Sequence, residues 1–83
     1  MTSDEILSNV RDAAVEVLGV EPEAVVESAQ FAEDLEADSL DLVELVMALE
    51  DALEIEIPEE ELEEVVTVGD AVRLIEAKTG AGA

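Results

Sequence analysis

The sequence predicts a small all-α bundle of three main helices plus one short helix, with a long loop between the first two. Apolar residues recur at helical spacing in three segments, capping patterns stand at the starts of these segments, and no segment alternates like a convincing strand. The length of 83 residues suits one domain, 1–83. We expect its tail, 79–83, to fray.

The first helix is expected at roughly residues 3–18. Thr2 with Glu5 three positions later matches a capping box, and Gly19 supplies a stop. The helical periodicity then fails over residues 19–37, so this segment is predicted to be a loop. Loops of this length in small domains are commonly functional.

Within this loop, Pro22 favours a single helical turn through Val26. Phe31 and Leu35 are the strong apolar positions farther on, and we expect them to pin the loop to the core.

The second helix is expected from Asp38 to Leu53, with Asp38 as its N-cap and Asp41 placing negative charge in the first turn. A short alternation of Ile55 and Ile57 follows, which we interpret as a hydrophobic connector rather than a strand.

Pro58 then opens a short acidic helical segment from Glu59 to about Val65. Thr67 with Asp70 caps a last helix that carries Lys78 near its end and is followed by Gly80.

The second helix carries two apolar stripes. The wide one, which suits a core-facing helix, consists of Leu42, Leu45, Val46, Leu49 and Leu53. At 100° per residue, Leu40, Val43 and Met47 fall about 140° away from it. Acidic residues border this second stripe: Asp41, Glu44, Glu50 and Asp51. An apolar centre with a charged rim is typical of a docking surface, and the alternative is that the bundle buries both stripes.

Acidic residues dominate the surface chemistry. Asp and Glu number 24 against 3 Lys and Arg, which gives a net charge of -21, and 15 of these acids lie within residues 33–64. With 49% hydrophobic residues the chain is still too apolar to be disordered by charge. The charge argues against nucleic acid or an anionic membrane as a partner and favours proteins with basic patches.

Catalysis by this chain alone is not expected. The sequence has no Cys and no His, which excludes disulfides, thiolate nucleophiles and a Ser-His pair. No stretch has the pattern of a calcium-binding EF-hand loop, so we expect no specific metal site. No secretory signal and no apolar run of membrane-spanning length is present, so we expect a cytoplasmic protein.

Ser39 stands at the start of the second helix. A serine there is ordinarily a capping or surface residue. The backbone N–H groups of a helix N-terminus can nevertheless receive a phosphate, so an esterified phosphate on Ser39 is tolerable. Because the chain lacks Cys and His, Ser39 cannot readily act as its own activated nucleophile. If it carries chemistry, a group must be attached to it.

The run FAEDLEADSLD at 31–41, followed by VELVMALE at 43–50, Ile57-Pro58 and Thr67-Val68, resembles the acyl carrier proteins of dissociated, bacterial-type (type II) fatty acid synthesis. The resemblance covers nearly the whole chain. It implies that 4'-phosphopantetheine is transferred from coenzyme A to Ser39 by a Mg²⁺-dependent holo-synthase, with Asp38 and Leu40 beside it. The terminal thiol of this arm then carries the acyl chain as a thioester.

The resemblance also implies two groups of functional residues. Those that dock partner enzymes are Asp38, Leu40, Asp41, Val43, Glu44, Met47, Glu50 and Asp51. Those that line an interior cavity for the acyl chain are Phe31, Val46, Leu49, Ile57, Leu62, Val65, Ala71 and Ile75. The implied partners are the holo-acyl-carrier-protein synthase and ketoacyl synthases, reductases, dehydratases and transacylases with basic patches. The chain is expected to be a monomer.

Two features depart from the family pattern. Glu36 stands where many members have Gly, and Arg11 is the only basic residue of the first helix. Glu36 adds an acid near Ser39 and is expected to alter the local turn or recognition by a holo-synthase.

Other functions remain open at this point. A polyketide or aminoacyl carrier protein shares the mechanism, whereas an acidic helical adapter or nucleic-acid mimic acts by charge alone and carries no prosthetic group.

Overall fold

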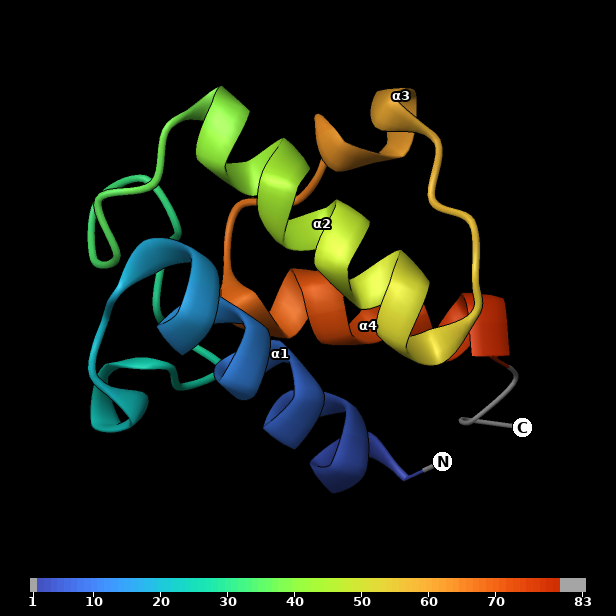
Figure 1. Ribbon diagram of the computed structural model, residues 1–83, viewed down its shortest axis with the longest axis horizontal. Helices are drawn as coiled ribbons and strands as arrows, with labels where there is room; N and C mark the ends of the chain where they lie inside the picture. The colour runs from blue at the N-terminus through green and yellow to red at the C-terminus, as the bar shows by residue number, and fades with distance from the viewer. Residues whose placement is uncertain (1, 80–83) are drawn as a thin grey trace.

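The computed structural model describes residues 2–79, and its helices follow the predicted order (Figure 1). Within these residues the elements are α1 (Ser3–Leu18), the 3-10 turn η1 (Pro22–Ala24), α2 (Ser39–Leu53), α3 (Glu59–Leu62) and α4 (Val68–Thr79). An isolated antiparallel bridge between Gln30 and Thr67 is the only extended pairing in the part of the chain that is described. The predicted all-α bundle, with three main helices and a short one, is therefore confirmed.

Helix α1 begins and ends where its sequence signals stand. The Thr2 hydroxyl accepts a hydrogen bond from the Glu5 N–H at 3.2 Å, and the Glu5 carboxylate accepts one from the Thr2 N–H at 3.4 Å. At the other end, Gly19 has a φ of 69° and its N–H donates to the carbonyl oxygen of Val15 at 3.1 Å. This left-handed conformation stops the helix and is cheap only for glycine.

Helix α2 also starts at a reciprocal cap. The Asp38 carboxylate accepts from the Asp41 N–H at 2.8 Å, and the Asp41 carboxylate accepts from the Asp38 N–H at 3.3 Å. These carboxylates satisfy backbone donors that the first turn of a helix otherwise leaves without partners. The predicted N-cap at Asp38 is confirmed, and the first helical residue is Ser39.

Two helical segments are shorter than the sequence predicted. The turn after Pro22 ends at Ala24 instead of Val26, and α3 ends at Leu62 instead of about Val65. Beyond Leu62 the chain closes three-residue turns, with the Val65 N–H donating to the Leu62 carbonyl oxygen at 3.0 Å. Five of the six residues 59–64 are Glu. Repulsion among carboxylates one turn apart disfavours a longer regular helix here.

The last helix reaches farther than predicted. Thr79, where we expected fraying to begin, is the final residue of α4, and the remaining predicted tail, 80–83, lies outside the described residues.

A single aliphatic core joins the helices. Helix α1 packs against both α2 and α4, and Figure 1 shows α4 behind α2 with α3 at the upper right. Phe31 is the only aromatic side chain in this core, and no polar or charged residue between 2 and 79 is buried. Burial of apolar surface therefore holds the fold together without internal polar networks.

The long loop is pinned to the core as predicted. Phe31 and Leu35 are both 3% exposed, and Val25, which the sequence did not single out as an anchor, is fully buried. The Phe31 N–H donates to the carbonyl oxygen of Val66 at 3.0 Å. The loop before α2 is thereby tied to the segment that precedes α4.

Among residues 2–79, no helix has both the length and the apolar character needed to span a bilayer.

Candidate functional site

Ser39 is exposed at the first position of α2. The loop that ends at Ala37 delivers it there, and Asp38 immediately before it fixes the start of the helix. Its hydroxyl is therefore accessible to a transferring enzyme, as attachment of a group requires.

The negative charges around Ser39 determine whether an anion can bind at the start of α2. The Asp38 carboxylate already occupies the Asp41 N–H, and Asp41 adds a second carboxylate in the same turn. A free anion would be repelled here, because the anion-binding capacity of the helix end is partly used and the local charge is negative. A phosphate joined to the Ser39 oxygen by a covalent bond escapes this problem by projecting into water. The position therefore disfavours a reversibly bound phosphate and leaves room for a group that is attached covalently and projects into water.

Two open grooves meet at Ser39. The first, which we name the loop-side groove, has a volume of about 350 Å³ and is lined by Phe31, Ala32, Ala37, Asp38, Ser39, Leu42, Val65 and Val66. The second, the α3-side groove, has a volume of about 240 Å³ and is lined by Ser39, Leu42, Val43, Glu59, Leu62 and Glu63. A group attached to Ser39 can therefore lie along either side of the start of α2.

Below the grooves the core contains a small apolar void of about 10 Å³. It is lined by Phe31, Leu42, Leu45, Val46, Leu49, Ile57, Leu62, Val65, Ala71, Leu74 and Ile75. All eight residues predicted to line a cavity are in this set. Their role in holding an acyl chain stays a prediction.

This void is too small to hold an acyl chain in the structure. A cavity needs about 10–15 Å³ to hold even one water, so an acyl chain can enter only when the aliphatic side chains move apart. Those movements break no buried side-chain hydrogen bond, because no polar residue between 2 and 79 is buried.

Leu42 lines the void and both grooves, and it is not among the site residues predicted from the sequence. The signal was present, because Leu42 lies three positions after Ser39 and therefore on the same side of α2. Val66 also lines a groove at Ser39, and no local pattern indicates this. It comes from a distant segment that only the tertiary fold brings to α2.

Two of the three residues in the second apolar stripe of α2 face solvent. Leu40 is 66% exposed and Met47 is 61% exposed, whereas Val43 is half-buried and packs partly against the core. The alternative that the bundle buries both stripes is thus wrong for Leu40 and Met47.

The carboxylates around this stripe are not equivalent. Glu44 and Asp51 are exposed, while Asp41 is half-buried in its capping interaction. Glu50 is half-buried and its Oε2 accepts a hydrogen bond from the Ile57 N–H at 2.8 Å. Glu50 thus orders the connector after α2, in addition to its predicted docking role.

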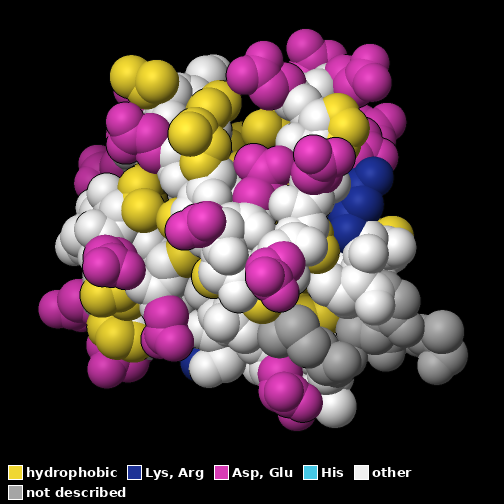
Figure 2. Space-filling model, turned by 45° about the vertical axis from the view of Figure 1, so that its right-hand side comes forward, with side chains coloured by type: hydrophobic (Ala, Val, Ile, Leu, Met, Phe, Trp, Pro, Cys, Tyr) yellow, Lys and Arg dark blue, Asp and Glu magenta, His cyan; other side chains and the backbone are white. Residues whose placement is uncertain are grey.

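The basic side chains are engaged within the molecule. Arg11 donates to the carbonyl oxygen of Val25 at 3.2 Å, and the Lys78 ammonium lies 2.8 Å from the Glu61 carboxylate. Arg73 pairs with Asp70. Figure 2 shows carboxylates over most of the visible face with hydrophobic side chains among them, and Lys and Arg mainly toward its right-hand side. The surface left for partners is therefore anionic and partly apolar.

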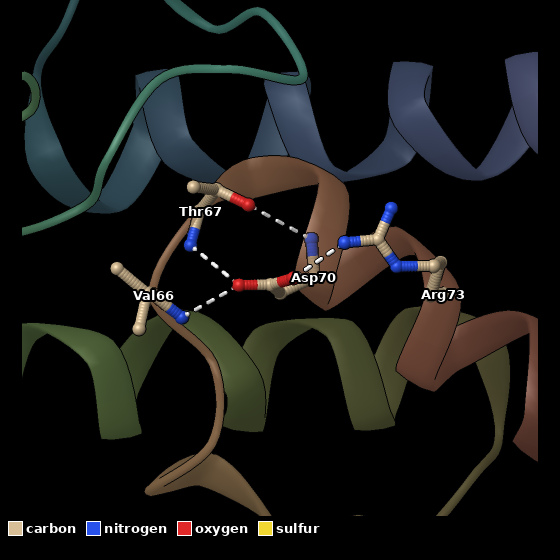
Figure 3. Close-up of polar contacts among 4 residues, drawn as sticks. All are labelled: Val66, Thr67, Asp70 and Arg73. Carbon is tan, nitrogen blue, oxygen red and sulfur yellow. Dashed lines mark hydrogen bonds and ion pairs between the residues drawn. The ribbon is translucent and has the colours of Figure 1, made fainter.

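Asp70 is the carboxyl with the clearest electrostatic perturbation (Figure 3). Hydrogen bonds from the backbone N–H groups of Thr67 and Val66, each 3.1 Å long, and then the pairing with Arg73 hold the pKa of Asp70 below its ordinary value. Asp70 lies at the start of α4 and organises the segment that carries Val66. Its role at the site is therefore structural.

Comparison with known proteins agrees with this geometry. The family profile described as "Phosphopantetheine attachment site" matches residues 8–75, which include Ser39, both grooves and the residues around the void. Proteins named acyl carrier protein are 58% identical over 71 residues in Wolinella succinogenes (86% of this chain, 93% of the relative) and 55% identical over 80 residues in Prochlorococcus marinus (96% and 100%). A third, from Caulobacter vibrioides, is 53% identical over 75 residues (90% and 96%). The chain belongs to the acyl carrier protein family.

Acyl carrier proteins are carriers and not enzymes. The match to a phosphopantetheine attachment site agrees with the predicted prosthetic group, 4'-phosphopantetheine. Within residues 2–79 no group of three or more acidic, Cys or His side chains is arranged to hold a metal ion.

Proposed function

We propose that this protein carries growing fatty acyl chains in type II fatty acid synthesis, as thioesters on a 4'-phosphopantetheine arm attached to Ser39. The observation that carries the proposal is the position of Ser39, which is exposed at the start of α2 between two grooves. It also lies inside the segment that matches the phosphopantetheine attachment family.

The attachment reaction requires little of the carrier itself. The Ser39 oxygen forms a bond to the phosphorus that bears pantetheine in coenzyme A, the pyrophosphate P–O bond breaks, and adenosine 3',5'-bisphosphate leaves. The Ser39 proton passes to a general base, a role that we assign to the holo-synthase. Ser39 contributes an accessible hydroxyl, and Asp38 and Asp41 contribute a rigid helix start.

Once attached, the arm supplies the thiol that this cysteine-free chain lacks. The residues of the chain then present it to partner enzymes. Leu40, Val43 and Met47 supply an apolar contact, and the surrounding carboxylates attract basic patches. Long-range attraction of this kind speeds association and leaves affinity moderate and sensitive to salt. A carrier that visits many enzymes needs both properties.

The proposed partners are the holo-acyl-carrier-protein synthase and the ketoacyl synthases, reductases, dehydratases and transacylases of the pathway. We further propose that the protein acts in the cytoplasm as a monomer, and that it binds neither nucleic acid nor anionic membranes because its charge of -21 repels both.

Mass spectrometry tests the attachment directly. After incubation with coenzyme A, Mg²⁺ and a holo-synthase, the wild-type protein should gain the mass of one phosphopantetheine, and Ser39→Ala should gain none. Ser28→Ala is the matched control, because Ser28 is an exposed serine of the loop outside both grooves. An unmodified wild type would favour the acidic adapter without a prosthetic group. If the arm is attached, a comparison of acyl transfer by fatty acid enzymes and by polyketide enzymes separates the two carrier pathways.

A further inference from the structure

The two grooves at Ser39 differ in charge, size and stiffness, and these differences bear on where the prosthetic arm lies between partner encounters. We propose that its pantetheine part rests in the loop-side groove, against Ala32 and Val66, and not in the α3-side groove. This inference rests on the proposed attachment at Ser39 and goes beyond it by assigning a binding site on the body of the carrier.

Charge distinguishes the grooves first. The loop-side groove has one acidic residue in its lining, Asp38, whose carboxylate is engaged by the Asp41 N–H. The α3-side groove is lined by Glu59 and Glu63, both exposed. Pantetheine beyond its phosphate is neutral, with two branching methyl groups and two amides. Placing it beside the two glutamates would remove water from carboxylates that have no basic partner there, which costs free energy.

Size favours the same groove. At about 350 Å³ the loop-side groove falls within the range of about 300–1,000 Å³ that is usual for small-molecule sites. The α3-side groove, at about 240 Å³, falls below it. The loop-side groove also offers apolar surface at its rim, because Val66 is 53% exposed. The branched methyl groups of the arm are suited to cover such a surface.

The wall that carries Val66 is held firmly. The Val66 N–H donates to the Asp70 carboxylate at 3.1 Å, and its carbonyl oxygen accepts from the Phe31 N–H at 3.0 Å. Figure 3 shows how Asp70 fastens this segment to the start of α4. Phe31 also lines this groove, so the hydrogen bond joins two of its lining residues, which come from distant segments of the chain. A preformed groove binds a flexible arm with a smaller loss of entropy than a groove that must first be ordered.

The outer wall of the α3-side groove is a short helix, which Leu62 anchors in the core. Helix α3 has only four residues, and the ion pair between Glu61 and Lys78 ties it to α4. Such a partly exposed pair contributes little to stability. The arm at rest therefore lies against the rigid, nearly uncharged wall.

Nuclear magnetic resonance of the holo-protein tests this placement. Coenzyme A labelled with ¹³C in the two branching methyl groups is used with a holo-synthase to load the carrier. We expect nuclear Overhauser contacts from these methyl groups to the side chains of Ala32 and Val66. We also expect the changes in amide shift between apo- and holo-protein, outside residues 38–41, to be largest at Phe31, Ala32 and Val66.

A pair of variants supplies the control. Val66→Glu should abolish the contacts to Ala32, because it places a charge in the groove. Val66 is 53% exposed, so the substitution leaves the core intact, and circular dichroism verifies that the helices remain. Val26→Glu, at a 45% exposed valine outside both grooves, should retain them.

Contacts to Val43 or Leu62, or no contact to either groove, would overturn the proposal while leaving Ser39 as the attachment residue. Absence of the added mass would instead refute the proposed function, so the two failures are distinguishable.

Discussion

Thr67 and Asp70 bond to each other reciprocally at the start of α4. The Thr67 hydroxyl accepts from the Asp70 N–H at 3.1 Å, and the Asp70 carboxylate accepts from the Thr67 N–H at 3.1 Å (Figure 3). The same carboxylate accepts from Val66, so one side chain orders both the helix start and the outer wall of the loop-side groove.

Asp70→Asn should lower the free energy of unfolding by about 1–2 kcal/mol at neutral pH, because it removes a charged acceptor from a helix cap. The folded pKa of Asp70 is lowered, so its contribution is fully present above the unfolded value of about 3.9 and is lost as pH falls through the folded pKa. Urea unfolding of wild type and variant between pH 7 and pH 2 measures this difference. Asp12→Asn, at an exposed position of α1, is the control for removal of one charge. Equal stability of Asp70→Asn and wild type at pH 7 would contradict the assigned role.

Salt should raise the thermal stability of the protein, because a net charge of -21 on a small domain produces strong self-repulsion that ions screen. A gain of 1 kcal/mol corresponds to a rise in Tm of about 4–8 °C for a domain of this size. Calorimetry from low to moderate NaCl checks this, and MgCl₂ at matched ionic strength separates screening from binding of the divalent ion. A Tm that stays flat across this range would refute the repulsion argument.

Glu36 and Glu54 both adopt left-handed backbone conformations, with φ of 53° and 56°. Glu36 stands where many family members have Gly, and its left-handed backbone gives the physical reason for that preference. A residue with a side chain pays about 1–2 kcal/mol to adopt the left-handed conformation, and glycine avoids this cost. Glycine also makes the unfolded chain more flexible, which offsets about 0.4–1 kcal/mol of the gain. Glu36→Gly should therefore stabilise the protein by about 0.5–1 kcal/mol.

Glu36→Ala is the matched variant, because it removes the same charge and keeps the strained backbone. Chemical denaturation of both variants separates the two effects. If Glu36→Ala stabilises as much as Glu36→Gly, charge repulsion and not backbone strain is the cause.

The sequence predicted those parts of the fold that depend on local signals. The Thr2 and Asp38 caps, the stop at Gly19 and the core stripe of α2 are all encoded within a few neighbouring residues, and the structure confirms them. The length of α3 was predicted wrongly. The apolar residues Leu62 and Val65 suggest a helix that continues to Val65, but α3 ends at Leu62. Repulsion among the carboxylates disfavours a longer helix, and the chain continues in three-residue turns.

The candidate site also has parts that local sequence signals predict and parts that they do not. Ser39 and the α2 stripe were found because motif and helical spacing identify them. The grooves were not predicted, because they form where α2 meets Val66 on one side and Glu63 on the other, and these segments are joined only by the tertiary fold.

Met47→Glu should weaken recognition by partner enzymes and leave the fold intact, because Met47 is 61% exposed on the second stripe of α2. A buried apolar contact at the centre of an interface typically contributes more than 1 kcal/mol, so we expect kcat/KM for transfer of phosphopantetheine by a holo-synthase to fall about tenfold. Glu44→Lys should act differently, by slowing association and reducing its dependence on salt, because rim charges mainly steer the encounter.

Val26→Glu is the matched control for Met47→Glu, since it places the same charge at an exposed apolar position outside α2. Steady-state kinetics at two salt concentrations, with circular dichroism on each variant, provide the measurements. Unchanged kcat/KM for Met47→Glu would remove this residue from the docking face. Loss of helicity would instead mean that Met47 contributes to the core, and the exposed stripe would then not be a free surface for partners.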